Sequence, residues 1–273
     1  MTRDERLGQR QLIHEKIVVP DELPRVSRSR LLRLLTENLT SYNATIINGR
    51  AGSGKTSLAA DFARYARRPV SWYKVDAADS DLHVFVAYLL ASLRLQRPSI
   101  NERLLEVTEA ATGDKAAFLA EALVVQLSQP GETQTEPLLI VIEDLHLVYD
   151  ADWVVPFFRR LLPLLPADLH LLITCRSMPP APLWRLRSKQ MLRVLDETEL
   201  GFTFDEVVAL FRTYGLGEEH ARVALRLANG RAATIARFAD TPGCAGLALA
   251  DSFLEIKRAR YGSLADQTPD FQT

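Results

Sequence analysis

The chain has 273 residues, of which 47% are hydrophobic, with 33 Lys and Arg against 34 Asp and Glu. This length and composition indicate a globular protein with one large domain and a smaller companion, and they exclude disordered, collagen-like and coiled-coil chains. A formal charge of -1 gives no global positive field toward nucleic acid or anionic lipid, so any such contact must be local.

The N-terminus, MTRDERLGQRQ, is charged where a signal peptide is apolar, and no run approaches the ~18 apolar residues that a membrane span requires. The two cysteines, Cys175 and Cys244, lack the spacing of metal ligands, and a chain of this size does not need a disulfide framework. We therefore expect a soluble, cytoplasmic protein without membrane contacts.

Short apolar runs alternate with longer amphipathic stretches, a pattern typical of a mostly parallel sheet joined by helical crossovers. The predicted strands, each rich in Val, Ile or Leu, are Thr45–Asn48, Val70–Val75, Leu138–Ile142, Leu169–Thr174 and Leu192–Leu195. The predicted helices around them are Ser29–Leu39, Lys55–Arg67, Leu82–Leu93, Ala116–Gln126 and Trp153–Leu165. Beyond Glu199 the strand signal disappears, and Phe204–Tyr214 and Glu218–Leu227 are predicted as helices of a small second domain.

The strongest motif is Gly49-Arg50-Ala51-Gly52-Ser53-Gly54-Lys55-Thr56, a complete G-x-x-x-x-G-K-[ST] pattern between a predicted strand and a predicted helix. Its glycines let successive backbone N–H groups point at phosphate oxygens, and the helix N-terminus adds its dipole. Lys55 is expected to reach the β- and γ-phosphates, and the Thr56 hydroxyl to ligate Mg²⁺. The expected nucleotide-binding residues of this loop are Gly49, Ala51, Gly52, Ser53, Gly54, Lys55, Thr56 and Ser57.

Acidic and basic residues follow two of the other predicted strands. The strand Leu138–Ile142 runs into Glu143 and Asp144, the position at which P-loop proteins hold the metal and orient the attacking water. Arg176 follows the strand Leu169–Thr174 and is a candidate sensor of the γ-phosphate, at the edge where open α/β sheets bind ligands. We therefore predict Lys55, Glu143, Asp144 and Arg176 as catalytic residues and Thr56 and Glu143 as metal ligands.

The motif and the alternating elements predict an α/β P-loop NTPase with a parallel sheet of about five strands, followed by a small helical domain. The expected organisation is an N-terminal arm at 1–28, a P-loop NTPase domain at 29–198 and a lid domain at 199–273. Whether Thr273 is a natural end or a truncation is left open by the sequence.

Two other features are interpreted as structural. Arg185, Arg187 and Lys189 lie in a stretch without acidic residues, which suggests a solvated face rather than a phosphate-backbone patch, so we expect no direct nucleic-acid binding by this segment. The histidines His83, His146, His170 and His220 have no mutual metal-ligand spacing and are interpreted as structural.

Together these residues resemble the STAND ATPases of the MalT type, large ATP-binding transcription regulators with a LuxR-type C-terminal domain. The matching elements are Lys16–Pro20, Val26–Leu31, Ala51–Ser57, Val70–Asp76 with Asp79 and Asp81, Glu143–Val148, Cys175–Pro180 and Phe202–Glu206. The resemblance spans roughly residues 16–236.

The resemblance implies a signal-transduction switch that binds ATP or ADP with Mg²⁺ and self-associates in its ATP state. It further implies that the segment with Val26 and Arg28 helps to hold the adenine. Its partners would be C-terminal sensor and DNA-binding domains, or separate proteins in their place. Glu143 stands where the family has Asp, and its extra methylene predicts slow hydrolysis.

Two alternatives to this weakly hydrolysing switch stay open. One is a nucleotide-stabilised interaction or scaffold module without significant turnover. The other is an initiator-like AAA+ ATPase that contacts DNA through the segment Arg185–Arg193, with binding that weakens steeply as salt rises.

Overall fold

The computed structural model describes residues 12–109, 114–129 and 136–240. The chain divides after Leu200 into two compact units, Met1–Leu200 and Gly201–Thr273. The first eleven residues of the predicted arm and the end of the predicted lid, including Cys244, lie outside the described residues. In the described part of the chain, no helix is long and apolar enough to cross a membrane.

The first unit is built around a single sheet of five strands. They are β1 (Ala44–Asn48), β2 (Val70–Lys74), β3 (Leu138–Glu143), β4 (Leu169–Cys175) and β5 (Leu192–Leu195). Their order is β2-β3-β4-β1-β5, and every neighbouring pair is parallel. The predicted α/β fold with five parallel strands is confirmed, and each strand lies within two residues of its predicted ends.

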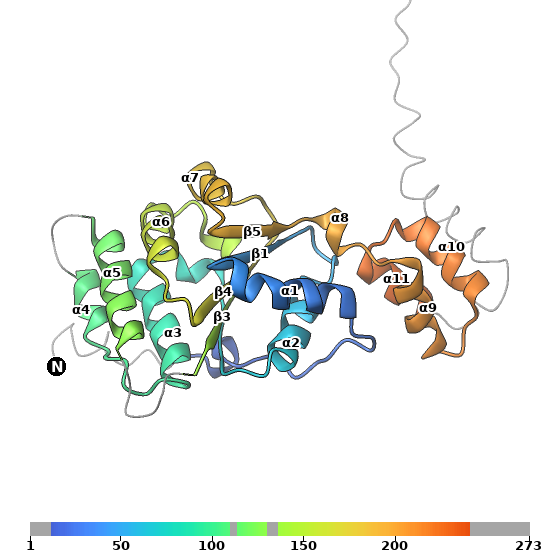
Figure 1. The fold of residues 1–273 in the computed structure, drawn as a ribbon, viewed down its shortest axis with the longest axis horizontal. Helices are drawn as coiled ribbons and strands as arrows, with labels where there is room; N and C mark the ends of the chain where they lie inside the picture. Colours follow the sequence, from blue (N-terminus) through green and yellow to red (C-terminus); the bar gives the residue numbers. More distant parts are fainter. Residues whose placement is uncertain (1–11, 110–113, 130–135, 241–273) are drawn as a thin grey trace, which may run out of the picture. The chain divides into compact units, whose positions relative to one another are not determined.

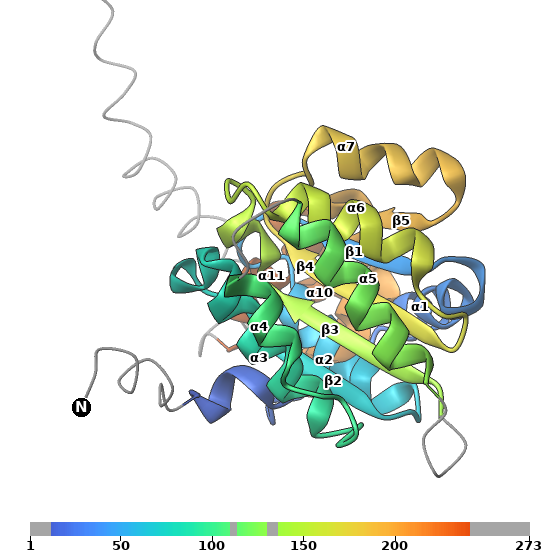
Figure 2. The ribbon, with the colours of Figure 1, turned by 90° about the vertical axis from the view of Figure 1, so that its left-hand side faces the viewer.

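Helices cover both faces of this sheet (Figures 1 and 2). The helices of the first unit are α1 (Ser29–Ser41), α2 (Lys55–Tyr65), α3 (Leu82–Arg94), α4 (Leu104–Glu109), α5 (Lys115–Ser128), α6 (Val154–Leu164), α7 (Ala181–Trp184) and α8 (Glu197–Leu200). Short 3-10 helices lie at η2 (His14–Ile17), η3 (Ala77–Ser80), η4 (Leu145–Val148) and η5 (Arg185–Lys189).

Alternation along the strands separates two buried clusters. On β3, Leu139 and Val141 pack with α1 and α2, whereas Leu138, Ile140 and Ile142 pack with α3, α5 and α6. Successive side chains of a strand point to opposite faces, so a strand buried on both sides must be apolar throughout. This is why these strands are continuous apolar runs. Parallel connection also brings the carboxyl ends of all five strands to one edge, where the chemistry-bearing residues follow.

The second unit, as far as it is described, contains α9 (Phe204–Arg212), α10 (Glu218–Ala228) and α11 (Ala232–Asp240). Thr203 and Glu206 form a reciprocal capping box at the start of α9. A Cβ atom on Gly230, which has φ +76°, would lie 3.2 Å from the Gly201 Cα, so this close approach requires glycine. The helix α11 and the short α4 were not among the predicted elements.

Candidate nucleotide site

The loop between β1 and α2 has the backbone that its glycines predict. Gly52 and Gly54 adopt left-handed φ values of 78° and 82°. A Cβ atom added to Gly49 would lie only 2.8 Å from the Ser53 hydroxyl oxygen. Glycine alone populates such conformations without a steric cost, so these three positions fix the curled path of the loop.

The N-terminus of α2 offers unused hydrogen-bond donors toward the inside of this loop. Gly54 caps the helix and supplies no side-chain hydrogen bond to the first turn. The Ser53 hydroxyl is buried, and no partner for it lies among the described residues. The first N–H groups of a helix have no intrahelical acceptor and carry the positive end of its dipole. This arrangement fits an anion such as phosphate.

Lys55, the first residue of α2, turns its ammonium group back onto the loop. Its Nζ donates to the carbonyl oxygens of Gly49 at 2.6 Å and Arg50 at 3.0 Å. The side chain is buried, and burial lowers the pKa of Lys55 below its usual range. A cation desolvated in this way gains from an anionic partner more than it would in water.

Thr56 and Glu143 meet across the carboxyl edge of the sheet. The Thr56 hydroxyl donates to Oε1 of Glu143 at 2.5 Å, and Oε2 of Glu143 is buried without a partner in the described structure. Burial raises the pKa of Glu143, although the Thr56 hydrogen bond opposes this shift. A hydroxyl and a carboxylate are ligands that Mg²⁺ accepts, so the residues present fit this ion.

Asp144 is held in an unusual backbone conformation beside this pair. Its φ is 57°, and its N–H donates to the Thr174 hydroxyl on β4 at 3.0 Å. Oδ1 of Asp144 lies 3.7 Å from both Nε of Arg176 and Nδ1 of His146. A left-handed aspartate is uncommon and persists where surrounding contacts determine it. Desolvation lowers the pKa of His146, which favours its neutral form.

The arm contacts the loop through Arg28, whereas the expected role of Val26 at the adenine stays a prediction. The Arg28 guanidinium is 5% exposed and donates to the carbonyl of Leu200 at 2.7 Å and that of Gly54 at 3.1 Å. It therefore ties the last residue of the P-loop before α2 to the end of α8. Val26 is half-buried, and no hydrogen bond or core cluster in the described residues includes it.

A second buried lysine anchors the arm farther along the sheet. Nζ of Lys16 lies 2.6 Å from each carboxylate oxygen of Asp79 and 3.1 Å from Oδ2 of Asp76. It also lies 4.1 Å from the centre of the Tyr88 ring. Asp76 and Asp79 form a capping box at the start of η3, directly after β2. The arm is thereby fixed to the carboxyl end of an edge strand.

The structure thus brings Lys55, Thr56, Glu143, Asp144 and Arg176 to one edge of the sheet. Ala51, Gly52 and Ser57 are exposed on the loop and the first turn of α2. Sequence reasoning missed Thr174, whose hydroxyl accepts the Asp144 N–H. The His146 ring lies beside Asp144, and the interpretation of this histidine as structural stays a prediction. The short interval between Glu143 and His146 could have placed this ring near the acidic residues, because a 3-10 turn directly after a strand keeps both residues at the end of that strand. The chemical roles of these residues stay predictions.

Comparisons with known proteins agree with this geometry. A family model described as AAA ATPase domain matches residues 25–174, more than half of the chain. The HTH-type transcriptional regulator MalT of Serratia proteamaculans is 31% identical over 201 residues, which are 73% of this chain and 22% of that protein. MalT of Yersinia enterocolitica is 30% identical with the same coverage. The chain therefore spans about a fifth of the length of these regulators, and its predicted resemblance to them is confirmed.

Among solved structures, a Walker-type ATPase of Pyrococcus abyssi aligns with a TM-score of 0.53 at 14% identity, covering 91% of this chain and 78% of that one. At this identity the likeness concerns the fold alone, and it agrees with the five-stranded sheet described above. The loop geometry, the acidic strand end and the match over residues 25–174 lead to one conclusion: the chain belongs to the AAA ATPase domain family.

Proposed function

We propose that this chain is the nucleotide-binding switch module of a transcription regulator, which binds ATP or ADP with Mg²⁺ and hydrolyses ATP slowly. The observation that carries the proposal is a buried lysine whose hydrogen-bond partners among the described residues are loop carbonyls, next to helix N–H groups without a side-chain cap. The similarity to MalT regulators supports the assignment to transcription control.

In this proposal, Lys55, the Ser53 hydroxyl and the first N–H groups of α2 bind the phosphates. Thr56 and Glu143 hold Mg²⁺, which when bound neutralises phosphate charge and aligns the oxygens for in-line attack. Without the ion, the Thr56 hydroxyl donates to Oε1 of Glu143, and bound Mg²⁺ would take the place of this hydrogen bond. The pKa of Glu143 is raised by burial, so a proton competes with the metal at this carboxylate.

Asp144 orients the attacking water and accepts its proton, while Arg176 stabilises the charge on the γ-phosphate. Both groups already converge, since the Arg176 Nε lies 3.7 Å from the Asp144 carboxylate. The Thr174 hydroxyl holds the Asp144 backbone in place during this step. Positioning and charge stabilisation supply most of the catalysis in phosphoryl transfer.

Slow turnover follows from the length of the Glu143 side chain. Its carboxylate reaches the Thr56 hydroxyl at 2.5 Å, a contact that the shorter Asp would make less closely. We expect Glu143→Asp to accelerate single-turnover ATP hydrolysis by ~10-fold or more, because misplacements near 1 Å are costly. Unchanged turnover in Glu143→Asp would favour the alternative in which nucleotide is a fixed brace of an interaction module.

A switch requires that ATP and ADP stabilise different states. Moving a two-state element from 1:99 to 99:1 needs ~5.5 kcal/mol of differential binding. Lys55 and Arg176, with the ion held by Thr56 and Glu143, are the groups placed to contact a γ-phosphate. We propose that their contacts with it favour the self-associating state, and that ADP favours the closed state.

The test is the nucleotide content of the purified protein, measured by anion-exchange chromatography after denaturation, with Lys55→Ala as the matched control. Stoichiometric ADP in the wild type and none in Lys55→Ala is the expected result. Bound ATP without ADP would mean that Glu143 stalls hydrolysis. An empty site, with no thermal shift at ATP concentrations that should add ~4.1 kcal/mol, would overturn the proposal.

A further inference from the structure

A groove lies beside the nucleotide site, between the segments that follow β2 and β3. It has a volume of about 480 Å³. It is lined by Ser80, Asp81, Leu82, Leu147, Val148, Asp150, Ala151, Asp152 and Trp153. We call it the acidic groove, because its lining includes three aspartates and no basic residue.

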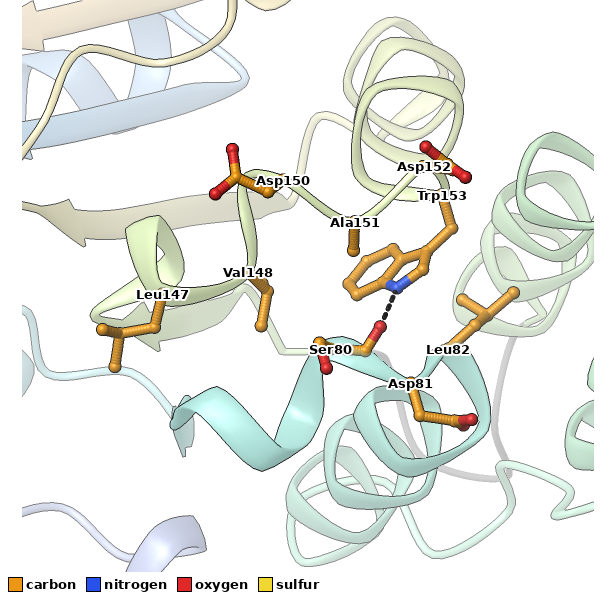
Figure 3. A pocket seen from close by; sticks show the side chains of 9 residues that line it. All are labelled: Ser80, Asp81, Leu82, Leu147, Val148, Asp150, Ala151, Asp152 and Trp153. Carbon is orange, nitrogen blue, oxygen red and sulfur yellow. Dashed lines mark hydrogen bonds between the residues drawn. The ribbon is translucent and has the colours of Figure 1, made fainter.

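Figure 3 places the Trp153 indole centrally among these residues, with the three aspartates around it. The indole N–H donates to the Ser80 carbonyl at 2.7 Å, which fixes the ring in the groove. Asp150 and Asp152 are exposed, and neither forms an ion pair within the described residues. Leu147, which is 45% exposed, adds an apolar lip. An aromatic ring beside carboxylates is a favourable environment for a guanidinium group.

The same chain carries a surface of opposite charge. Arg185, Arg187 and Lys189 of η5 are all exposed, and no acidic residue occurs between Arg176 and Asp196. The Arg187 guanidinium lies 5.0 Å from the centre of the Trp184 ring. We call Arg185–Lys189 the basic segment. Within the described structure, none of its cations forms an ion pair.

The two surfaces are attached to opposite edges of the sheet. The acidic groove follows β2, one edge strand, and β3, whereas the basic segment leads into β5, the other edge strand. We propose that the acidic groove of one molecule binds the basic segment of a second copy of this chain. Each copy presents both halves, so the contact is heterologous and can be repeated from copy to copy.

The acidic groove is also coupled to the nucleotide site by direct chain connection. Leu147 and Val148 lie on η4, which starts immediately after Asp144, and the Leu147 N–H donates to the Asp144 carbonyl at 3.0 Å. A shift of Asp144 therefore moves one wall of the groove. This coupling, unlike the contact itself, rests on the proposed function. In that function, bound ATP would position the wall of the acidic groove so that it binds the basic segment.

A charge-swap experiment tests the contact in the full chain by sedimentation velocity, with Mg²⁺ and a non-hydrolysable ATP analogue. One variant reverses the groove (Asp150→Lys with Asp152→Lys), and another reverses the segment (Arg185→Glu with Lys189→Glu). A control reverses two exposed charges of α1 (Arg33→Glu with Glu37→Lys). Thermal unfolding confirms that each variant is folded, and anion-exchange chromatography measures its bound nucleotide.

We expect wild type and control to self-associate, and each reversed variant to associate at least ~10-fold more weakly because like charges then meet. An equimolar mixture of the two reversed variants should regain association, since each presents the complement of the other. The contact should weaken as salt rises.

A monomeric wild type, association that survives either reversal, or a mixture that stays monomeric would each overturn the proposal. Added duplex DNA is a further arm: if the segment-reversed variant loses DNA binding while self-association is unchanged, the segment serves nucleic acid instead. Association without any bound nucleotide would uphold this contact and contradict the proposed function, so the two can fail separately.

Discussion

Two buried lysines, Lys16 and Lys55, lie at the same edge of the sheet but have opposite kinds of partner. Lys16 is 7% exposed and is neutralised by the carboxylate of Asp79 at 2.6 Å. Lys55 is 6% exposed and contacts only carbonyl oxygens among its described hydrogen-bond partners. Carbonyls are weaker partners for a cation than anions are, so Lys55 can exchange them for phosphate. Lys16 is fixed, and this difference separates a structural cation from a binding one.

The largest expected effect comes from removing the structural cation. Lys16→Ala leaves the carboxylate of Asp79, which is 1% exposed, buried without its partner. Breaking a buried ion pair in this way costs about 3–5 kcal/mol. Urea unfolding should report this loss. The double variant Lys16→Ala with Asp79→Ala should recover part of it, because no charge then remains uncompensated. Equal losses of unfolding free energy in the single and double variants would contradict an energetic coupling between Lys16 and Asp79.

A third buried basic group, His170, sharpens the comparison because it is kept neutral. Its ring nitrogens contact the Thr45 hydroxyl at 3.0 Å and the Tyr42 carbonyl at 2.9 Å, and burial lowers its pKa to about 4. The unfolded chain takes up a proton near its usual pKa of about 6.5, while the folded chain does not. The contribution of His170 is therefore fully present above pH 6.5 and is lost as pH falls toward 4, by about 3 kcal/mol.

Urea unfolding of wild type and His170→Gln at pH 7 and pH 4.5 measures this contribution. The difference in stability between the two proteins should shrink as the pH falls, because only the wild type loses stability through His170. A difference that does not change with pH would mean that the folded chain takes up this proton as readily as the unfolded chain does.

Removing the binding cation should affect ligand affinity rather than folding. Lys55→Ala is expected to weaken nucleotide binding by ~10- to 100-fold, as loss of a charge-assisted hydrogen bond does. Its stability without nucleotide should change little, since only contacts to loop carbonyls are lost. Isothermal titration calorimetry and thermal unfolding of nucleotide-free protein separate the two effects. If Lys55→Ala destabilised the nucleotide-free protein as much as Lys16→Ala does, Lys55 would be a structural cation as well.

The smallest effect is expected for an ion pair at the surface. Arg50 forms an ion pair with Glu197 at 2.9 Å, with its side chain 79% exposed. Such pairs contribute ~0.2–1 kcal/mol, so Arg50→Ala should shift the unfolding temperature only slightly. The same scan at high salt should remove even this shift, whereas the Lys16→Ala effect should persist.

Local patterns predicted much of this architecture. The strands β1 to β5 were predictable because burial on both faces demands uninterrupted apolar runs, and the Gly49–Thr56 loop because its conformation requires glycines. The six-residue helix α4 was missed, since one and a half turns do not establish a period. α11, with small and polar residues in its sequence AATIARFAD, gave a weak signal.

Contacts between distant residues were not predictable in the same way. The Arg28 guanidinium bonds to the carbonyl of a residue 172 positions later, and a carbonyl carries no sequence signal. The order β2-β3-β4-β1-β5 likewise depends on how crossovers pack, not on any one strand. The approach of His146 to Asp144 was not predicted, because a search for metal spacing compares histidines only with one another.

The bridge made by Arg28 has a mechanical consequence. One planar, rigid guanidinium donates to the carbonyl of Gly54, directly before α2, and to that of Leu200, the last residue before the second unit starts. The distance between its two donor nitrogens is fixed. A displacement of the nucleotide loop must therefore either move the Leu200 carbonyl as well or break one of the two hydrogen bonds of Arg28. Within the first unit, the nucleotide loop and the end of α8 are thus linked directly through the Arg28 side chain.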